Sequence, residues 1–306
     1  MRAIVISLAV VVATGITADP SSGSTARVAA APVRASASSG VASIDTAVVA
    51  DGPAERGTRE QISPFPIAPP VANPTLTGCD AGVLQALVQT NRTARQWIIV
   101  ITPSVQSTDA SLQIATLGID DVWHCSLAAT DAALGSNGIR PLVDRRSGDD
   151  TTPAGIFPLG SVNTPQGPAS FFGNSDDPGV LGAYRLVQPD DCYGANPNTV
   201  GYGHWRSDIT GCVGDDELLI SKGAAYEFAV LIGANTEPNV SGDAPGEIPY
   251  AAAIFLHRMS YTSSGTAKPT SGCVSIGHTA LLMAVRTIDP ALAPHFAIGT
   301  RASFTG

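Results

Sequence analysis

Two residues in the C-terminal part of the chain have types that can perform thiol chemistry together. His257 follows the apolar run 251–256, and Cys273 ends a polar loop rich in Ser, Thr and Gly. A thiolate rather than a thiol attacks a carbonyl, so a catalytic cysteine needs a base or a cation beside it. An imidazole titrates near neutral pH and can later return the proton to a leaving amine. The pattern predicts that Cys273 is a nucleophile and that His257 is its general base.

The residues just before Cys273 indicate how such a reaction would be supported. Gly272 lets the backbone approach a substrate closely, and backbone N–H groups around Ser271, Gly272 and Cys273 would form an oxyanion hole. A backbone carbonyl near residues 258–260, or a carboxylate, would hold the tautomer of the imidazole. The structural alternative is that Cys273 is only a small buried hydrophobe, as free cysteines often are.

Cysteine pairing separates Cys273 from the other cysteines. The chain has five cysteines, and in an exported protein an odd number leaves one thiol unpaired. Cys192 and Cys212 bracket a loop rich in Gly, Asn and Pro and are the first candidate pair, while Cys79 and Cys125 are the second. Spacing alone does not fix the connectivity. On this hypothesis the remaining free thiol is that of Cys273.

The N-terminal part of the chain has the composition of an export signal and a spacer. Arg2 precedes the apolar run 3–13, which is too short to span a bilayer. We therefore expect residues 1–18 to be a signal peptide or an N-terminal anchor, and residues 19–74 to be a disordered linker rich in Ala, Ser and Pro. Residues 75–306 would be the catalytic domain of a secreted or cell-envelope protein, with membrane contact only through the N-terminal segment.

The charge balance and the motifs exclude several classes of partner. The chain has 17 Lys and Arg against 26 Asp and Glu, and nucleic acid or anionic lipid would need a basic surface instead. His124 and Cys125 are adjacent, but no second pair lies at zinc-ligand spacing. No phosphate-binding glycine loop is present. We therefore expect no nucleic acid, no metal and no organic cofactor.

The hydrophobic pattern predicts a mainly β domain with few short helices. Residues 80–90 and 279–288 have apolar side chains at helical spacing. Short apolar, β-prone runs recur between turn-forming clusters, which is typical of an all-β architecture. The runs expected to form strands are 96–102, 111–117, 122–126, 139–143, 155–159, 183–187, 226–232, 252–256 and 295–298.

Two segments of the chain resemble the signatures of one enzyme family. His257 followed by Thr270-Ser271-Gly272-Cys273 resembles the His…[Ser/Thr]-His-Gly-Cys signature of the L,D-transpeptidase catalytic domain, also called the YkuD-type domain. The upstream stretch 148–157, Gly-Asp-Asp-Thr-Thr-Pro-Ala-Gly-Ile-Phe, is similar to the Gly-Asp-Gly-x-Thr-Pro-x-Gly-x-Phe stretch of the same family. The resemblance covers about residues 96–298.

The resemblance implies a fold, a reaction and roles for named residues. The fold would be a β-sandwich or barrel-like domain. A cysteine of the family attacks the amide after the third residue of a peptidoglycan stem peptide, the terminal D-alanine leaves, and an amine of a neighbouring stem receives the acyl group. Carried over to this sequence, Cys273 is the nucleophile, His257 is the base, and Ser271 and Gly272 contribute to the oxyanion hole. Tyr261 and Thr270 would contact the substrate, and the alternative for Tyr261 is an ordinary exposed tyrosine of the loop.

The sequence departs from the family pattern at three points. Ser271 stands where the family has His, Ser275 stands where it has Arg or Asn, and the interval between His257 and Cys273 is shorter than usual. Two alternatives therefore stay open beside transpeptidation. One is an L,D-carboxypeptidase or amide hydrolase on the same scaffold, and the other is a cell-wall-binding module without catalysis.

Overall fold

The computed structural model describes residues 76–306, and its regular elements are mainly strands. The helices are α1 (Ala81–Thr90), α2 (His278–Thr287) and α3 (Arg301–Thr305), with short 3₁₀ turns η2 (Leu142–Asp144), η3 (Ile209–Gly211), η4 (Leu219–Tyr226) and η5 (Pro290–Leu292). The strands of the large sheet are β1 (Gln96–Thr102), β2 (Asp109–Leu117), β3 (Trp123–Ala133), β4 (Ile139–Pro141), β5 (Thr152–Pro158), β8 (Phe171–Gly173), β9 (Tyr184–Leu186), β13 (Ala229–Leu231), β14 (Phe255–Arg258), β15 (Val274–Ile276) and β16 (His295–Thr300). The small sheets contain β6 (Val162–Thr164), β7 (Gly167–Ala169), β10 (Asp191–Tyr193), β11 (Trp205–Ser207) and β12 (Glu217–Leu218). The prediction of a mainly β domain with few short helices is confirmed.

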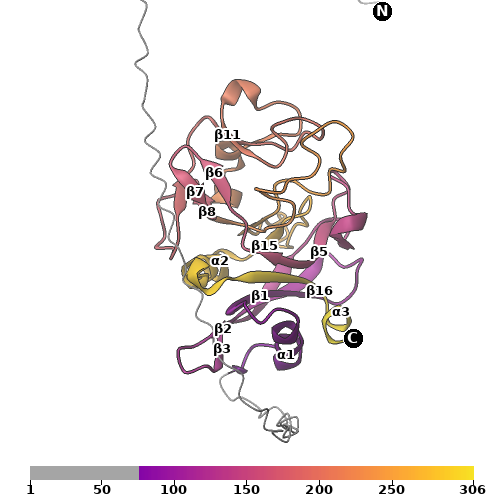
Figure 1. Cartoon of the computed structure of the whole chain (residues 1–306), viewed down its shortest axis with the longest axis vertical. Coiled ribbons are helices and arrows are strands. Elements are labelled where there is room, and N and C mark those ends of the chain that lie inside the picture. The colour runs from indigo at the N-terminus through magenta and orange to yellow at the C-terminus, as the bar shows by residue number, and fades with distance from the viewer. Residues whose placement is uncertain (1–75) are drawn as a thin grey trace, which may run out of the picture. The chain divides into compact units, whose positions relative to one another are not determined.

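An 11-stranded mixed sheet organises the domain, in the order β4-β5-β16-β1-β2-β3-β15-β14-β13-β8-β9. The pairs β1 with β16 and β14 with β15 run parallel, whereas β15 with β3 and β14 with β13 run antiparallel. A three-stranded sheet, in the order β11-β10-β12, is separate from it. In Figure 1, β1 and β16 lie between α1 and the segment that carries β11.

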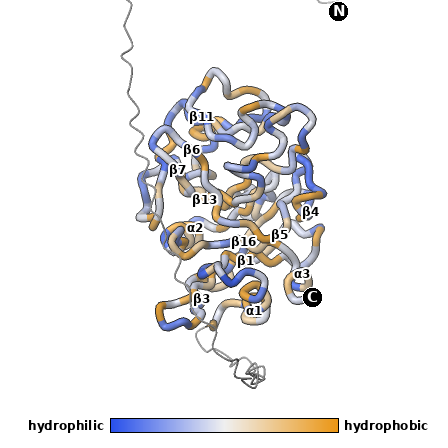
Figure 2. Tube along the Cα trace, viewed as in Figure 1, coloured by the Kyte–Doolittle hydropathy of each residue, from blue (hydrophilic) through white to orange (hydrophobic). Residues whose placement is uncertain are grey.

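The central strand β1 is buried on both faces because different elements cover each face. On one face Ile98 and Val100 of β1 share a core with the buried side of α2. On the other face Trp97 and Ile99 pack with α1. Asp80 caps α1 by accepting a hydrogen bond from the Val83 N–H at 3.1 Å. Figure 2 shows the hydrophobic segments gathered on these strands and helices, with hydrophilic stretches on the connecting loops.

A second cluster surrounds β13 and β14 and contains the free cysteine. Its large side chains are aromatic and stack edge-on around Phe255, with Phe172 and Tyr193 at centroid distances of 5.0 and 5.2 Å. The three-stranded sheet covers this cluster, because β10 supplies Tyr193 and β11 supplies Trp205. Neighbouring residues of β14 therefore enter different cores, with Leu256 in the α2 core and Phe255 in the aromatic cluster.

Both predicted disulfides are present. Cys79 is bonded to Cys125, Cys192 is bonded to Cys212, and Cys273 is free and buried. Cys192 lies on β10, so its disulfide ties the three-stranded sheet to the loop that follows η3. The separation of 20 residues between its cysteines corresponds to a stabilisation of about 3 kcal/mol from loop closure.

Element boundaries differ from the sequence predictions near the aromatic cluster. The run 226–232 is predicted to be a strand, but Tyr226 ends η4 and the strand β13 covers only Ala229–Leu231. The run 252–256 is predicted to end before His257, but β14 begins at Phe255 and includes His257. The strands β6, β7, β8, β10, β11, β12 and β15 are missing from the prediction, because each has only two or three residues and shows no periodicity.

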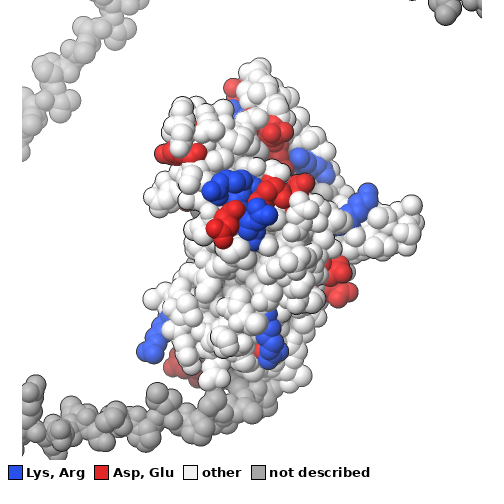
Figure 3. Space-filling view, turned by 90° about the vertical axis from the view of Figure 1, so that its right-hand side faces the viewer, with Lys and Arg blue, Asp and Glu red and all other residues white. Residues whose placement is uncertain are grey.

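The predicted signal peptide (1–18) and linker (19–74) lie outside the described residues. Within residues 76–306, no helix is long and apolar enough to cross a membrane. Figure 3 shows basic and acidic side chains intermixed in one patch on the face that it presents.

Candidate active site

The parallel pairing of β14 and β15 brings His257 and Cys273 to the same face of the large sheet. In this register His257 lies opposite Ser275, and Leu256 lies opposite Val274. Side chains alternate between the two faces of a strand, so Cys273 and Ser275 point to the same side as His257. Val274 and Leu256 point into the α2 core instead. His257 and Cys273 accordingly line one cavity, as the sequence predicts for a nucleophile and its base.

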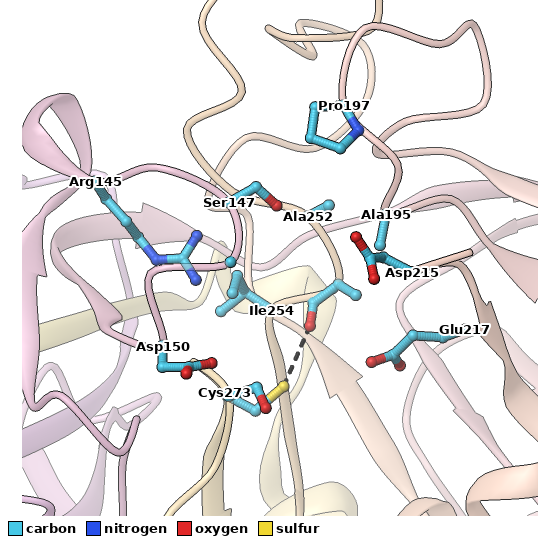
Figure 4. A pocket seen from close by; sticks show the side chains of 13 residues that line it. Arg145, Ser147, Asp150, Ala195, Pro197, Asp215, Glu217, Ala252, Ile254 and Cys273 are labelled. Carbon is cyan, nitrogen blue, oxygen red and sulfur yellow. Dashed lines mark hydrogen bonds between the residues drawn. The ribbon is translucent and has the colours of Figure 1, made fainter.

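The thiol of Cys273 is held by the backbone of the strand beside it. Its Sγ donates to the Ala253 carbonyl oxygen at 3.2 Å and accepts from the Phe255 N–H at 3.4 Å. Figure 4 shows the sulfur at the floor of a pocket with the first of these bonds drawn. Among the hydrogen bonds of residues 76–306, none joins Cys273 to the imidazole of His257. The S–H bond must therefore turn away from the Ala253 carbonyl oxygen before His257 can take the proton.

The imidazole of His257 is held as a neutral base. Its Nδ1 donates to the Arg258 carbonyl oxygen at 2.9 Å. Because a carbonyl only accepts, Nδ1 carries the proton and Nε2 keeps its lone pair. Burial lowers the pKa of His257, and the charge of Lys222 lowers it further, against the opposing effect of the bond to Arg258. The predicted backbone partner of the imidazole is confirmed.

Burial also keeps Cys273 neutral in the resting site. Desolvation and the nearby carboxylate of Glu217 raise the pKa of the thiol to about 12. The Phe255 N–H and the charges of Arg145 and Lys222 oppose this shift. Because the pKa of the imidazole is lowered as well, the resting pair is a thiol and a neutral imidazole rather than a preformed ion pair. In a reaction of this pair, proton transfer would accompany attack by the sulfur.

The turn that precedes Cys273 is closed by the hydroxyl of Thr270. That hydroxyl donates to the Cys273 carbonyl oxygen at 2.7 Å and accepts the Gly272 N–H at 3.1 Å. The Gly272 N–H is therefore already used, which differs from its expected role as an oxyanion donor. The backbone N–H groups of Ser271 and Cys273 bond to no other residue within 76–306. Thr270 lines the cavity, but its hydroxyl is engaged within the turn.

The upstream family-like segment meets this turn. The Thr152 hydroxyl donates to the Cys273 carbonyl oxygen at 3.3 Å and accepts the Gly135 N–H at 2.8 Å. Arg145 is buried, with 2 % of its surface exposed, and its Nε donates to the Thr151 carbonyl oxygen at 2.7 Å. The two segments that carry the resemblance are far apart in the sequence, yet they share direct contacts at Cys273.

Two cavities meet at the sulfur. The first, here called the Arg145 cavity, has a volume of about 280 Å³. The second, the His257 cavity, has a volume of about 230 Å³. Their common wall consists of Glu217, Ser271 and Cys273. In Figure 4, Arg145 and Asp150 face Asp215 and Glu217 across the Arg145 cavity, with Cys273 below them.

Three residues between β12 and the end of η4 line the site, although the sequence analysis does not single them out. Glu217, Lys222 and Tyr226 all line the His257 cavity. Glu217 and Lys222 form an ion pair at 3.4 Å, and the ring of Tyr226 packs edge-on against that of His257 at 5.3 Å. No motif marks these residues. Only the spacing of Lys222 and Tyr226, four residues apart, would have suggested a shared face.

Ser275 occupies the place where the family has Arg or Asn. It is buried, with 1 % of its surface exposed, and it lines the His257 cavity. Its hydroxyl has no hydrogen-bond partner among the described residues. The position therefore presents a small neutral donor and acceptor to the cavity instead of a charged or amide side chain.

Tyr261 does not lie with Cys273. It is 52 % exposed and lines a different cavity, together with Asp109, Asp131 and Met259. The structure therefore places Tyr261 outside the two cavities that Cys273 lines, and its contact with a substrate stays a prediction. The reason is that the chain turns away after Met259, whose N–H is bonded to the Ile276 carbonyl oxygen at 2.7 Å.

Within residues 76–306, no group of three or more His, Cys, Asp or Glu side chains is placed to hold a metal ion.

Comparisons with protein-family models, with curated proteins and with solved structures find nothing that matches this chain. The geometry of the cysteine site and the two motif segments are therefore the features that indicate its chemistry.

Proposed function

We propose that the protein is a cysteine-dependent acyltransferase of the L,D-transpeptidase type, acting on peptidoglycan stem peptides outside the cytoplasm. The observation that carries the proposal is the contact of both family-like segments at Cys273, where Thr152 and Thr270 donate to the same carbonyl oxygen. The placement of His257 in the same cavity supports it. The mainly β architecture agrees with the fold that the resemblance implies.

Acylation would begin with a proton transfer from Cys273 to Nε2 of His257. The sulfur then forms a bond to the carbonyl carbon of the stem amide, and the carbonyl oxygen becomes an oxyanion. The N–H groups of Ser271 and Cys273 would stabilise that oxyanion. When the intermediate collapses, the C–N bond breaks and His257 returns its proton to the departing amine. The product is a thioester on Cys273 and a free D-amino acid.

Transfer would reverse these roles on a second substrate. A neutral amine attacks the thioester, its proton passes to His257, and Cys273 leaves and regains a proton. The meeting of two cavities at the sulfur supports transfer, since the acyl group and the acceptor can approach from different sides. Asp150 and Asp215 in the Arg145 cavity suit an ammonium group, and Lys222 and Lys268 in the His257 cavity suit a carboxylate.

The first test is covalent labelling of the thiol by a carbapenem, read by intact-protein mass. We expect the wild-type protein to gain one inhibitor mass and the Cys273→Ala variant to gain none, with both disulfides still formed. Equal labelling of the two proteins would refute the proposal. The matched control is Ser303→Ala, which alters a residue of α3 and should label as the wild type does.

The second test is product analysis with a stem tetrapeptide and an amine-bearing stem as acceptor. A cross-linked dimer indicates transfer, whereas a trimmed stem alone indicates the carboxypeptidase alternative. Retention on purified cell wall without any Cys273-dependent product would indicate a binding module instead.

A further inference from the structure

Tyr226 contacts both members of the proposed catalytic pair. It is buried, with 4 % of its surface exposed, and it ends η4, which contacts β10 of the three-stranded sheet. Its ring packs edge-on against the imidazole of His257 at 5.3 Å and against Phe255 at 5.6 Å. Tyr226 shares the aromatic cluster with Cys273 and lines the same cavity. Its position is therefore fixed by packing rather than by solvent.

The hydroxyl of Tyr226 lies near two groups that can accept a hydrogen bond. It donates to Oε2 of Glu217 at 2.5 Å, and Cys273 belongs to the same cluster and lines the same cavity. A phenol has one proton to donate, so it can serve the carboxylate or the sulfur but not both. Which acceptor receives it depends on where the negative charge lies.

Glu217 is held next to the thiol by several contacts. It lies on β12, opposite Tyr193 of β10, and forms an ion pair with Lys222 at 3.4 Å. A carboxylate beside a thiol disfavours the thiolate because the two negative charges repel each other. Glu217 is also part of the wall between the two cavities. The charge of Glu217 therefore disfavours the thiolate directly. Glu217 also disfavours it indirectly, because it accepts the hydrogen bond of the Tyr226 hydroxyl.

We propose that Tyr226 is a switchable hydrogen-bond donor: Glu217 holds its hydroxyl while Cys273 is a thiol, and the sulfur receives it when the thiol loses its proton. In this step the S–H proton passes to Nε2 of His257. The Tyr226 proton stays on its own oxygen and only changes acceptor, and Glu217 remains a carboxylate. Tyr226 and Glu217 are thus positioning residues for the thiolate. The inference rests on the proposed function only in taking Cys273 as the reacting thiol.

The test is the rate of Cys273 alkylation by iodoacetamide between pH values of about 6.5 and 9.5, which depends on the thiolate fraction. In Tyr226→Phe the thiolate loses a donor while the ring is kept, so we expect alkylation about tenfold slower at each pH. In Glu217→Gln the repelling charge is removed and the hydroxyl is freed, so we expect alkylation about tenfold faster. The two variants therefore shift the pH profile of the alkylation rate in opposite directions.

Tyr193→Phe is the matched control. Tyr193 is fully buried in the same aromatic cluster and packs on Phe255, but its hydroxyl donates to the Gly203 carbonyl oxygen at 3.0 Å. Its alkylation profile should equal that of the wild type. The other charged and titratable groups around the thiol are unchanged in all variants, namely Lys222, His257 and Lys268 on one side and Arg145, Asp150 and Asp215 on the other.

The double variant Tyr226→Phe with Glu217→Gln separates the two effects of Glu217. If Glu217 acts partly by occupying the hydroxyl, Glu217→Gln should accelerate alkylation less when combined with Tyr226→Phe than it does alone. Overlapping profiles for Tyr226→Phe and wild type, or slower alkylation in Glu217→Gln, would overturn the inference. Since alkylation needs no cell-wall substrate, these results are independent of whether the carbapenem and stem-peptide tests succeed.

Discussion

The backbone of Gly272 lies against the guanidinium group of Arg145. A Cβ atom at Gly272 would stand 2.6 Å from Nη2 of Arg145 and 3.0 Å from the Thr151 carbonyl oxygen. Arg145 has little freedom to move away, because Nε donates to Thr151 and Nη1 donates to the Tyr250 carbonyl oxygen at 2.8 Å. A buried cation therefore supports the turn that presents the thiol.

Replacing Gly272 by Ala should disable the site. The residue has φ +138°, where an L side chain costs roughly 1–3 kcal/mol of strain, and the added methyl group would displace the turn or Arg145. We expect carbapenem acylation to slow by about a hundredfold, which corresponds to about 2.7 kcal/mol, measured by stopped-flow or mass spectrometry. Gly265→Ala is the control, because Gly265 has φ +83° and nothing within 4 Å of a Cβ atom. Equal rates for both variants would show that the contact with Arg145 is unimportant.

His257→Ala should separate catalysis from thiol reactivity. General acid–base catalysis contributes about 10²–10⁴-fold, so we expect acylation by a carbapenem or a stem peptide to slow by that factor. A reactive alkylating reagent at high pH should still modify Cys273, because its thiolate then forms without a base. The control is His124→Ala, which removes an exposed imidazole paired with Asp120 at 3.2 Å. Unchanged acylation in His257→Ala would mean that another residue is the base.

The candidate pair could be predicted from the sequence because residue type and motif order carry its signal. His257 and Cys273 lie on one face through the pairing of β14 with β15, and the apolar run that leads into β14 is visible in the sequence. Glu217 and Tyr226 were not predictable, because they lie in a region of strands only two or three residues long. That region is ordered by the disulfide between Cys192 and Cys212 and by aromatic packing. Long-range contacts, rather than local pattern, place these side chains.

The pH dependence of stability should report the raised pKa of Cys273. The thiol has a pKa of about 8.5 in an unfolded chain and about 12 in the folded protein. A raised pKa means that the stabilisation is complete below a pH of about 8.5 and is lost as pH rises toward the folded value. Above that pH, the wild type should lose unfolding free energy relative to Cys273→Ala, by up to about 1.4 kcal/mol per pH unit. Urea titrations at pH values of about 7.5, 9 and 10 would measure it. A difference independent of pH would contradict this prediction.

The ion pair between Arg185 and Asp191 should be essential to the three-stranded sheet. Asp191 is fully buried and accepts two bonds of 2.8 Å from Arg185, as well as one from the Ser207 hydroxyl at 2.6 Å. Burial raises the pKa of Asp191, but these hydrogen bonds outweigh it and lower the pKa overall. The contribution to stability is thus present above about pH 4 and is lost as pH falls through the lowered value.

Asp191→Asn should destabilise the protein by about 3–5 kcal/mol, since it leaves the buried Arg185 uncompensated. The measurement is urea unfolding at about pH 7. Asp120→Asn is the matched control, since Asp120 is an exposed partner of His124, and it should leave the free energy of unfolding nearly unchanged. A similar small effect at Asp191 would show that the sheet does not depend on this pair.

The parallel pairing of β14 and β15 determines which part of the loop between them can vary in length and sequence. Two parallel neighbours need a long return connection, and here the segment 259–273 makes it. Its base is anchored, because the Thr270 N–H bonds to the Leu134 carbonyl oxygen at 2.7 Å and the Lys268 N–H bonds to the Ser260 carbonyl oxygen at 2.8 Å. The tip, residues 262–266, is exposed and bonds mainly to itself. The length and sequence of the tip can therefore change without altering the strand register that places His257 and Cys273 on one face.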